Sequence, residues 1–336
     1  MAAPLPKRTL SDDDKYALMV SNVQEVIRGD IIRDILPVGP LKIYWGTATT
    51  GRPHAACFLP VIKIAQFLQA GCQVKILLAD LHGFLDADNA PEGVLENRAQ
   101  YSVASYQLSP AFSRDLLRPS KKVSVHDAVR ASSEIVKSMG ELVMADGIYP
   151  MMQLLDEQYL DIDAEAHLMN PMVPGLAGGK MSSSDIKSKI DLRDDAETIR
   201  KKVAKAHCNP RATEGNGILA FIQHALLPHS ELLSADGKAS IEVALKDQTE
   251  ATTFHSFPKV VAVYESDSLA PQLAKKIVQD GLAKLTESIR RGFDADQEWQ
   301  EIARPAYPDT PNKDTKKPIK EKPKKKSGVI VPVVDM

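Results

Sequence analysis

Apolar positions recur at helical spacing near the start of the chain, over residues 11–36. The series runs from Tyr16 through Val20 to Ile35, with polar residues between its members. This spacing predicts an amphipathic helix or a pair of helices, because apolar residues three to four positions apart share one helix face. We therefore interpret residues 1–36 as an N-terminal helical segment.

A strand, a turn, a helix and a second strand follow. Residues 41–45 form a short apolar strand, which a Thr- and Gly-rich turn, Gly46–Gly51, closes. A helix is predicted from about 54–70, with Gly71 as its stop. The near-continuous apolar run 74–79 is typical of a parallel strand buried on both faces. This βαβ order predicts a doubly wound sheet with ligands at the strand ends.

The remaining pattern is mostly helical, apart from a second buried strand that we expect at 167–173. Helical spacing covers the ranges 91–165, 194–207, 217–227 and 269–291. A basic Pro/Lys tail, which cannot bury enough apolar surface to fold alone, follows Pro305. The predicted fold class is α/β, with a Rossmann-like parallel sheet and a mainly helical C-terminal domain. The predicted segments after the N-terminal one are a catalytic domain at 37–190, a helical domain at 191–304 and the tail at 305–336.

Composition restricts the kinds of protein that the chain can be. It is 43% hydrophobic and 26% charged, with a net charge of -2, as in ordinary globular proteins. The three cysteines, Cys57, Cys72 and Cys208, lie far apart and fit no zinc spacing, which favours a reducing compartment. Residues 1–15 lack the apolar core of a signal peptide, and no run is long enough to span a membrane. We expect a soluble intracellular protein without a membrane partner or a protein-held metal.

The first candidate for chemistry is the turn from Gly46 to His54, which lies between a predicted strand and a predicted helix. Its backbone N–H groups and the helix N-terminus could hold phosphate, and the imidazole of His54 could reach a phosphoryl oxygen. A Thr/Gly turn with a capping histidine explains the same residues equally well when the turn is considered alone.

The second candidate is the loop Gly178–Ser184, which carries Lys180 and three consecutive serines. The lysine could reach the same phosphates, although such a loop is more often simply polar. The two candidates together are far more specific than either one. A His motif after the first strand and a Lys-Met-Ser-Ser-Ser loop after the last strand match the two signature motifs of class I aminoacyl-tRNA synthetases.

Further segments resemble one branch of that family, the eukaryotic-type, fungal-like cytoplasmic tyrosyl-tRNA synthetases. The matching segments are Leu41–Gly51, Gly71–Cys72, Leu78–His82, Tyr106–Ser109, Tyr149–Tyr159 and His167–Gly175. The resemblance implies a tyrosine–tRNA ligase that binds ATP with Mg²⁺, L-tyrosine and tRNA(Tyr). It also implies a homodimer in the cytoplasm, and the Lys-rich tail could direct a nuclear pool.

The resemblance also assigns roles to residues. It implies catalytic contacts to the phosphates and the pyrophosphate from His54, Thr50, Lys180, Ser182, Ser183 and Ser184. It implies ATP binding by Gly46, Thr47, Gly51, His54, Lys180 and Met181. It implies tyrosine binding by Tyr44, Tyr149, Gln153, Asp156, Gln107 and His82. The spacing of Tyr149, Gln153 and Asp156 would let one helix face present all three, although a core tyrosine and a surface acid are the common alternative.

The chain also departs from the family at four places. One is the diverged region between Pro110 and Gly147, which in the family contributes to the dimer interface. A helix and a strand are absent after Arg98, so the sheet could be one strand short, and a Gly-Gly-x-Asp-Gln-Arg-Lys segment with its helix is absent after Ala164. The anticodon-reading His-Pro-x-Asp-Leu is replaced by Glu265–Leu269, which leaves Asp267 one place early. Two alternatives therefore stay open. One is a tyrosine-adenylating paralogue with another acceptor, and the other is an inactive paralogue that binds tyrosine or RNA.

Overall fold

The computed structural model describes residues 5–48, 51–86, 107, 109–133, 144–162, 166–176, 189–245 and 250–307. The helices are α1 Asp12–Val20, α2 Gly29–Ile35, α3 Phe58–Gln69, α4 Asp80–Asp86, α6 Pro110–Leu116, α7 Val125–Ser133, α8 Met144–Tyr159, α9 Ala196–Ala204, α10 Gly217–Phe221, α11 Leu227–Leu233, α12 Phe257–Glu265, α13 Pro271–Ala295 and α14 Gln297–Ala306. The strands are β1 Glu25–Ile27, β2 Lys42–Ala48, β3 Gln73–Ala79, β4 His167–Met169, β5 Ile241–Val243 and β6 Thr252–Phe254. Short turns of 3-10 or π helix are η1 Ala55–Cys57, η3 Pro119–Lys121 and η4 Ile222–Leu226.

The predicted βαβ unit is confirmed. Strands β2 and β3 pair in parallel over their full length, and α3 connects them and packs on β3. Gly71 ends the helix with a positive φ of 85°, a left-handed backbone conformation that glycine adopts without a Cβ penalty. The carboxyl end of β2 therefore points to the turn that leads into η1 and α3.

The expectation that both apolar strands are buried on both faces is wrong. In β3 only Leu77 and Ala79 are buried, and the side chain of Ile76 is 52% exposed. Within the described residues β3 has no strand partner besides β2, so helices and strands cover only part of it. The strand expected at 167–173 is only the three-residue β4, because Pro171 ends the extended run. Its Met169 is 46% exposed.

The N-terminal segment forms the predicted pair of helices, α1 and α2. Between them lies the short strand β1, which the helical spacing of the apolar residues did not predict. Strand β1 pairs antiparallel with β4, so the segment is attached to a part of the chain 140 residues away in the register Ile27 to His167. From α3, the ammonium of Lys63 donates to the carbonyls of Leu18 and Met19 at the end of α1 (3.3 and 3.2 Å). Burial lowers the pKa of Lys63 to about 8.

The largest core joins the two predicted domains. Its buried residues come both from α3 and from the C-terminal helices, and they include Phe58 and Ile62 on one side and Phe221, Tyr264 and Val278 on the other. The C-terminal part is mainly helical, as predicted, with a small β5–β6 hairpin. Because one core spans the predicted boundary at residue 190, the C-terminal helices hold α3 in a fixed position.

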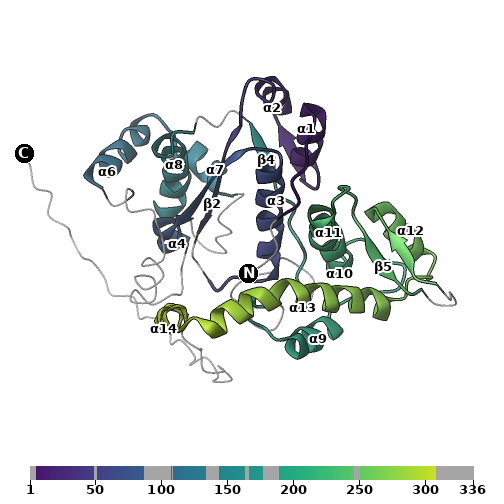
Figure 1. Ribbon diagram of the computed structural model, residues 1–336. Helices are drawn as coiled ribbons and strands as arrows, with labels where there is room; N and C mark the ends of the chain where they lie inside the picture. Colours follow the sequence, from purple (N-terminus) through teal and green to yellow (C-terminus); the bar gives the residue numbers. More distant parts are fainter. Residues whose placement is uncertain are drawn as a thin grey trace, which may run out of the picture.

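Helix α13 is the long axis of the C-terminal part and is longer than the predicted 269–291. It runs from the side of α12 and β5 to α14, beneath α3 (Figure 1). Its Gly281 allows a close approach to the π turn η4, since a Cβ there would lie 2.6 and 2.8 Å from the two methyl groups of Leu226.

We expect Gly281→Ala to destabilise the protein by about 1 kcal/mol. Alanine gains about 1 kcal/mol in helix propensity over glycine, but forcing extra volume against a packed side chain costs about 1–3 kcal/mol. Gly292→Ala on the same helix is the matched control, because its Cβ would meet only Trp299 at 3.9 Å. Urea denaturation should show a lower midpoint for Gly281→Ala and a higher one for Gly292→Ala. Equal shifts of both midpoints would contradict this packing argument.

Candidate active site

The turn that follows β2 is fixed by a distant segment of the chain. His54 forms an isolated antiparallel bridge with Asp191, and the N–H of Ala55 donates to the carbonyl of Ile190 (2.8 Å). The structure thus places His54 after β2, the strand that begins the βαβ unit, and directly before η1 and α3, as the sequence predicted. The bridge joins the turn to the segment that follows the predicted Lys-Met-Ser loop.

Arg52, which the sequence analysis did not single out, joins this turn to the end of α14. Its guanidinium donates to the carbonyl of Tyr307 (2.9 Å) and lies 3.6 Å from the carboxylate of Asp191. It also lies 5.8 Å from the centre of the Tyr307 ring, within the range of a cation–π contact. The sequence could have indicated Arg52, because it is a basic residue inside a turn that was predicted to bind phosphate.

The side chain of Tyr44 lies over Gly46 on the same face of β2. A Cβ at position 46 would stand 2.5 Å from the Tyr44 hydroxyl, so glycine is the residue that leaves this ring in place. Burial raises the pKa of Tyr44 above its usual range, and the nearby carboxylate of Asp156 raises it further. The phenol therefore stays protonated at neutral pH and can donate a hydrogen bond.

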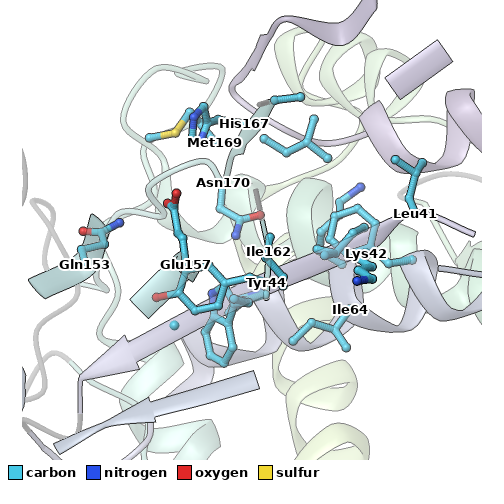
Figure 2. A pocket seen from close by; sticks show the side chains of 18 of the residues that line it. Leu41, Lys42, Tyr44, Ile64, Gln153, Glu157, Ile162, His167, Met169 and Asn170 are labelled. Atoms are coloured by element: carbon cyan, nitrogen blue, oxygen red, sulfur yellow. The ribbon is translucent and has the colours of Figure 1, made fainter. Parts of the chain in front are cut away.

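A cleft of about 1150 Å³ opens between β2 and α8. Six of the predicted site residues line it, namely Tyr44, Gly46, Thr47, His82, Tyr149 and Gln153. Glu157, one turn beyond Gln153 on α8, lines it as well and was missed (Figure 2). The cleft is larger than the 300–1,000 Å³ that is usual for small-ligand sites.

Asp156 lies behind the cleft wall, so the expected helix stripe is only partly correct. Its side chain is fully buried, and one carboxylate oxygen accepts a hydrogen bond from the amide of Gln107 (2.7 Å). The other oxygen lies 3.7 Å from Nδ1 of His82, whose ring meets that of Tyr149 edge to face at 4.5 Å. On α8, Glu157 and Gln158 line the cleft together with Tyr149 and Gln153. The predicted residues Gln107 and His82 thus lie next to Asp156, and the carboxylate of Asp156 points towards them.

Several predicted residues lie elsewhere. Gly51 and His54 belong to the turn and are not part of the cleft wall. The predicted residues outside the described part of the chain are Thr50, Lys180, Met181, Ser182, Ser183 and Ser184.

Asp267 follows α12 in a left-handed conformation with φ of 65°. Its N–H donates to the carbonyl of Tyr264 (3.1 Å), and its half-exposed carboxylate faces Arg211 at 3.7 Å. It therefore lies on a helix cap and not within a helix or a strand.

The described residues contain neither a candidate membrane span nor a cluster of metal ligands. None of the helices there combines the length and the hydrophobicity of a membrane span. No three His, Cys, Asp or Glu side chains in that part of the chain are gathered as metal ligands would be.

The family model described as tRNA synthetases class I (W and Y) matches residues 37–138 and 162–286, more than half of the chain. The chain belongs to this family. It is 38% identical to the cytoplasmic tyrosine–tRNA ligase of Saccharomyces cerevisiae, covering 95% of this chain and 93% of that one. It is also 38% identical to the cytoplasmic tyrosine–tRNA ligase of Danio rerio, of which it spans 64%. The eukaryotic tyrosyl resemblance inferred from the sequence is thereby confirmed.

A solved structure shows the same fold. The tyrosyl-tRNA synthetase of Archaeoglobus fulgidus, complexed with L-tyrosine, superposes with a TM-score of 0.75 at 24% identity, covering 84% of this chain and 99% of that one. This confirms the Rossmann-like class I architecture. The alignment with the yeast relative extends over 370 positions, more than the 336 residues here, so the relative has segments that this chain lacks.

Proposed function

We propose that the chain is a tyrosine–tRNA ligase, which activates L-tyrosine with ATP and transfers it to tRNA(Tyr). The observation that carries this proposal is the arrangement around one strand. Tyr44 of β2 lines the cleft, its burial and the charge of the buried Asp156 carboxylate raise the pKa of its phenol, and the same strand leads into the His54 turn. A site for an aromatic amino acid and a site for phosphates are thus adjacent, in a chain that belongs to the class I synthetases.

Tyr44 and Asp156 are the groups that we assign to the substrate phenol. Tyr44 stays protonated and Asp156 is an acceptor, so together they can complement a hydroxyl that both donates and accepts. Asp156 lies behind the cleft wall with its carboxylate towards Gln107 and His82, so it would have to turn from these partners into the cleft to accept from the phenol. Tyr149 and Gln153, whose side chains reach the cleft, would take the ammonium group.

Adenylation depends more on aligning the tyrosine carboxylate with the α-phosphate of ATP than on proton transfer. A carboxylate oxygen of tyrosine attacks the α-phosphorus of ATP, the bond to the bridging oxygen breaks, and pyrophosphate leaves. Backbone groups of Gly46, Thr47 and Gly51, with the side chains of His54 and Thr50, would position the phosphates. The loop from Lys180 through Met181 to Ser184 would stabilise the charge on the departing pyrophosphate. Magnesium would arrive with ATP as part of the substrate.

In the second step a ribose hydroxyl at the 3′ end of the tRNA attacks the carbonyl carbon of the adenylate, and AMP leaves. We assign RNA recognition to the C-terminal residues 191–304.

A homodimer is also proposed, in keeping with strongly exposed apolar side chains in α7 and α8, such as Val125 (81%) and Met144 (82%). We infer a cytoplasmic protein from the names of the relatives, which offer no support for a nuclear pool.

Tyrosine-dependent exchange between ATP and pyrophosphate tests the first half of this proposal. We expect exchange to be at least tenfold faster with tyrosine than with phenylalanine or any other amino acid. Exchange in the absence of tRNA charging would favour a paralogue with another acceptor. No exchange, with tyrosine binding retained, would favour the inactive paralogue.

Charging should depend little on the anticodon. Base-specific recognition needs a side-chain acceptor at a fixed place against a splayed base edge. Asp267 is held on a helix cap with its carboxylate towards Arg211, and Glu265 adds a second negative charge near the RNA. We therefore expect less than about a threefold loss of tRNA charging when the first anticodon base is changed. A large loss that Asp267→Ala abolishes would contradict this prediction.

A further inference from the structure

Two aromatic rings meet where α13 passes into α14. Phe293 of α13 and Trp299 of α14 lie edge to face, with their ring centres 5.2 Å apart. The guanidinium of Arg193 lies 4.6 Å from the centre of the Phe293 ring, in a cation–π contact. Trp299 is 38% exposed. We call Arg193, Phe293 and Trp299 the aromatic corner.

Hydrogen bonds hold the backbone of the corner at a fixed place. Asp296 caps α14 by accepting from the main-chain N–H of Trp299 (2.9 Å). The side-chain amide of Gln300 donates to the carbonyl of Phe293 (2.9 Å), so the last turn of α13 is tied to the first turn of α14. An exposed tryptophan on such a backbone is preorganised, and a ligand that stacks on it pays little for ordering it.

The aromatic corner is connected to the phosphate turn from two sides. Arg193 lies 3.8 Å from the carboxylate of Asp191, the residue whose backbone bridges to His54. Arg52 of the turn donates to the carbonyl of Tyr307, which directly follows α14 (2.9 Å). The corner therefore lies beside the turn at which the phosphates of ATP would be held.

The charge at this junction is positive. Arg52 and Arg193 share the single carboxylate of Asp191, at 3.6 and 3.8 Å. The side chain of Arg193 is 31% exposed, so it can face a ligand from its place beside Phe293. An exposed aromatic ring next to an excess of guanidinium charge suits unpaired nucleotides, which present a flat base and a phosphate together.

We propose that the aromatic corner binds an unpaired nucleotide at the 3′ end of the tRNA, by stacking its base on Trp299. This inference rests on the proposed function, because the transfer step brings the RNA 3′ end to the adenylate at the His54 turn. Arg193 contacts the adjacent backbone phosphate. The base then holds the 3′ end near the site without reading the sequence, since every base has a face that can stack.

Distance excludes the anticodon as the source of this nucleotide. The 25 residues of α13 span about 37 Å. Asp267 precedes the first residue of this helix, whereas Phe293 lies in its last turn beside α14 (Figure 1). A base bound near Asp267 is therefore too far away to stack on Trp299.

The test compares two RNAs with four proteins. The RNAs are a minihelix of the tyrosine tRNA acceptor stem with its unpaired 3′ nucleotides, and the same minihelix made blunt. The proteins are the full chain, Trp299→Ala, Trp299→Phe and Leu68→Ala. The phenylalanine variant keeps an aromatic ring, and Leu68→Ala is the matched control, because it removes an apolar side chain of α3 that is 55% exposed. Melting temperatures check that each variant is folded.

We expect Trp299→Ala to weaken binding of the overhanging minihelix about tenfold, as for the loss of one stacked base. Trp299→Phe should weaken it less than about threefold, and no variant should change binding of the blunt minihelix more than about twofold. Leu68→Ala should bind both RNAs as the full chain does. Equal losses on both RNAs, or no loss on either, would overturn the inference.

Fluorescence separates stacking from a structural role of the ring. The chain has two tryptophans, so Trp299 is the only one left in a Trp45→Phe variant. The overhanging minihelix should quench its emission, and the blunt minihelix should not. Quenching by neither RNA, or by both to the same extent, would contradict stacking. Because these are binding measurements, they stand even if the chain fails to charge tRNA, which would count against the proposed function alone.

Discussion

His54→Ala and Lys180→Ala should each lower tyrosine-dependent ATP–pyrophosphate exchange by about 10²–10³-fold. Removing one preorganised group that stabilises developing charge typically costs that much in rate. The His54 change leaves the backbone of the turn in place, because the bridge to Asp191 and the Ala55 hydrogen bond involve main-chain atoms. Exchange rates at saturating tyrosine and ATP, with melting temperatures as a check of folding, measure the effect.

Matched controls separate this effect from a general loss of charge. His126→Ala removes a histidine whose side chain is 84% exposed, and Lys201→Ala removes a lysine whose side chain is 70% exposed. Both control variants should exchange at the rate of the parent. Parent-like rates for His54→Ala or for Lys180→Ala would show that the phosphate assignment is wrong.

Tyrosine should bind about 10- to 100-fold more tightly than phenylalanine. A site built around a hydroxyl leaves buried polar groups unpaired when the hydroxyl is missing, at a cost of about 1–3 kcal/mol. The tyrosyl enzymes as a family reject phenylalanine by about 10⁵-fold, a family property that serves here only as an upper bound. We expect less from this chain, with weak tyrosine affinity, because the cleft of about 1150 Å³ leaves room for water around the ligand.

Calorimetry with the two amino acids measures this ratio, and two variants on α8 locate its origin. Asp156→Asn keeps the shape of a fully buried side chain but removes its charge beside Tyr44, so the ratio should fall towards one. Glu157→Gln removes a charge from the cleft wall one residue away and should leave the ratio unchanged. Equal binding of tyrosine and phenylalanine by the parent, or no binding of either, would contradict the assignment.

Local patterns predicted much of the fold. The βαβ unit, the stop at Gly71 and the long helix near the C-terminus follow from hydrophobic spacing and from glycine chemistry, which act within a few residues. The exposure of Ile76 could not be predicted in this way, because it depends on which elements cover the strand.

In the candidate site, too, local motifs predicted some features, whereas others depend on residues far apart in the sequence. Motifs predicted that Tyr44, Tyr149 and Gln153 share a cleft, because a strand end and a helix face bring them together. They did not predict that Asp156 turns away from the cleft towards Gln107, since this depends on a partner 49 positions away. The contact of Arg52 with Tyr307 joins residues 255 positions apart, and no local pattern indicates it.

Tyrosylation of a tyrosine tRNA transcript by the 336-residue chain tests the central claim most directly. With ATP, magnesium and labelled tyrosine, we expect labelled tRNA to accumulate over many turnovers. The initial rate should fall at least tenfold when labelled phenylalanine replaces tyrosine, and about 10²–10³-fold when His54→Ala replaces the parent. A parent chain that is folded and binds tyrosine, but leaves the tRNA unlabelled, would contradict the account.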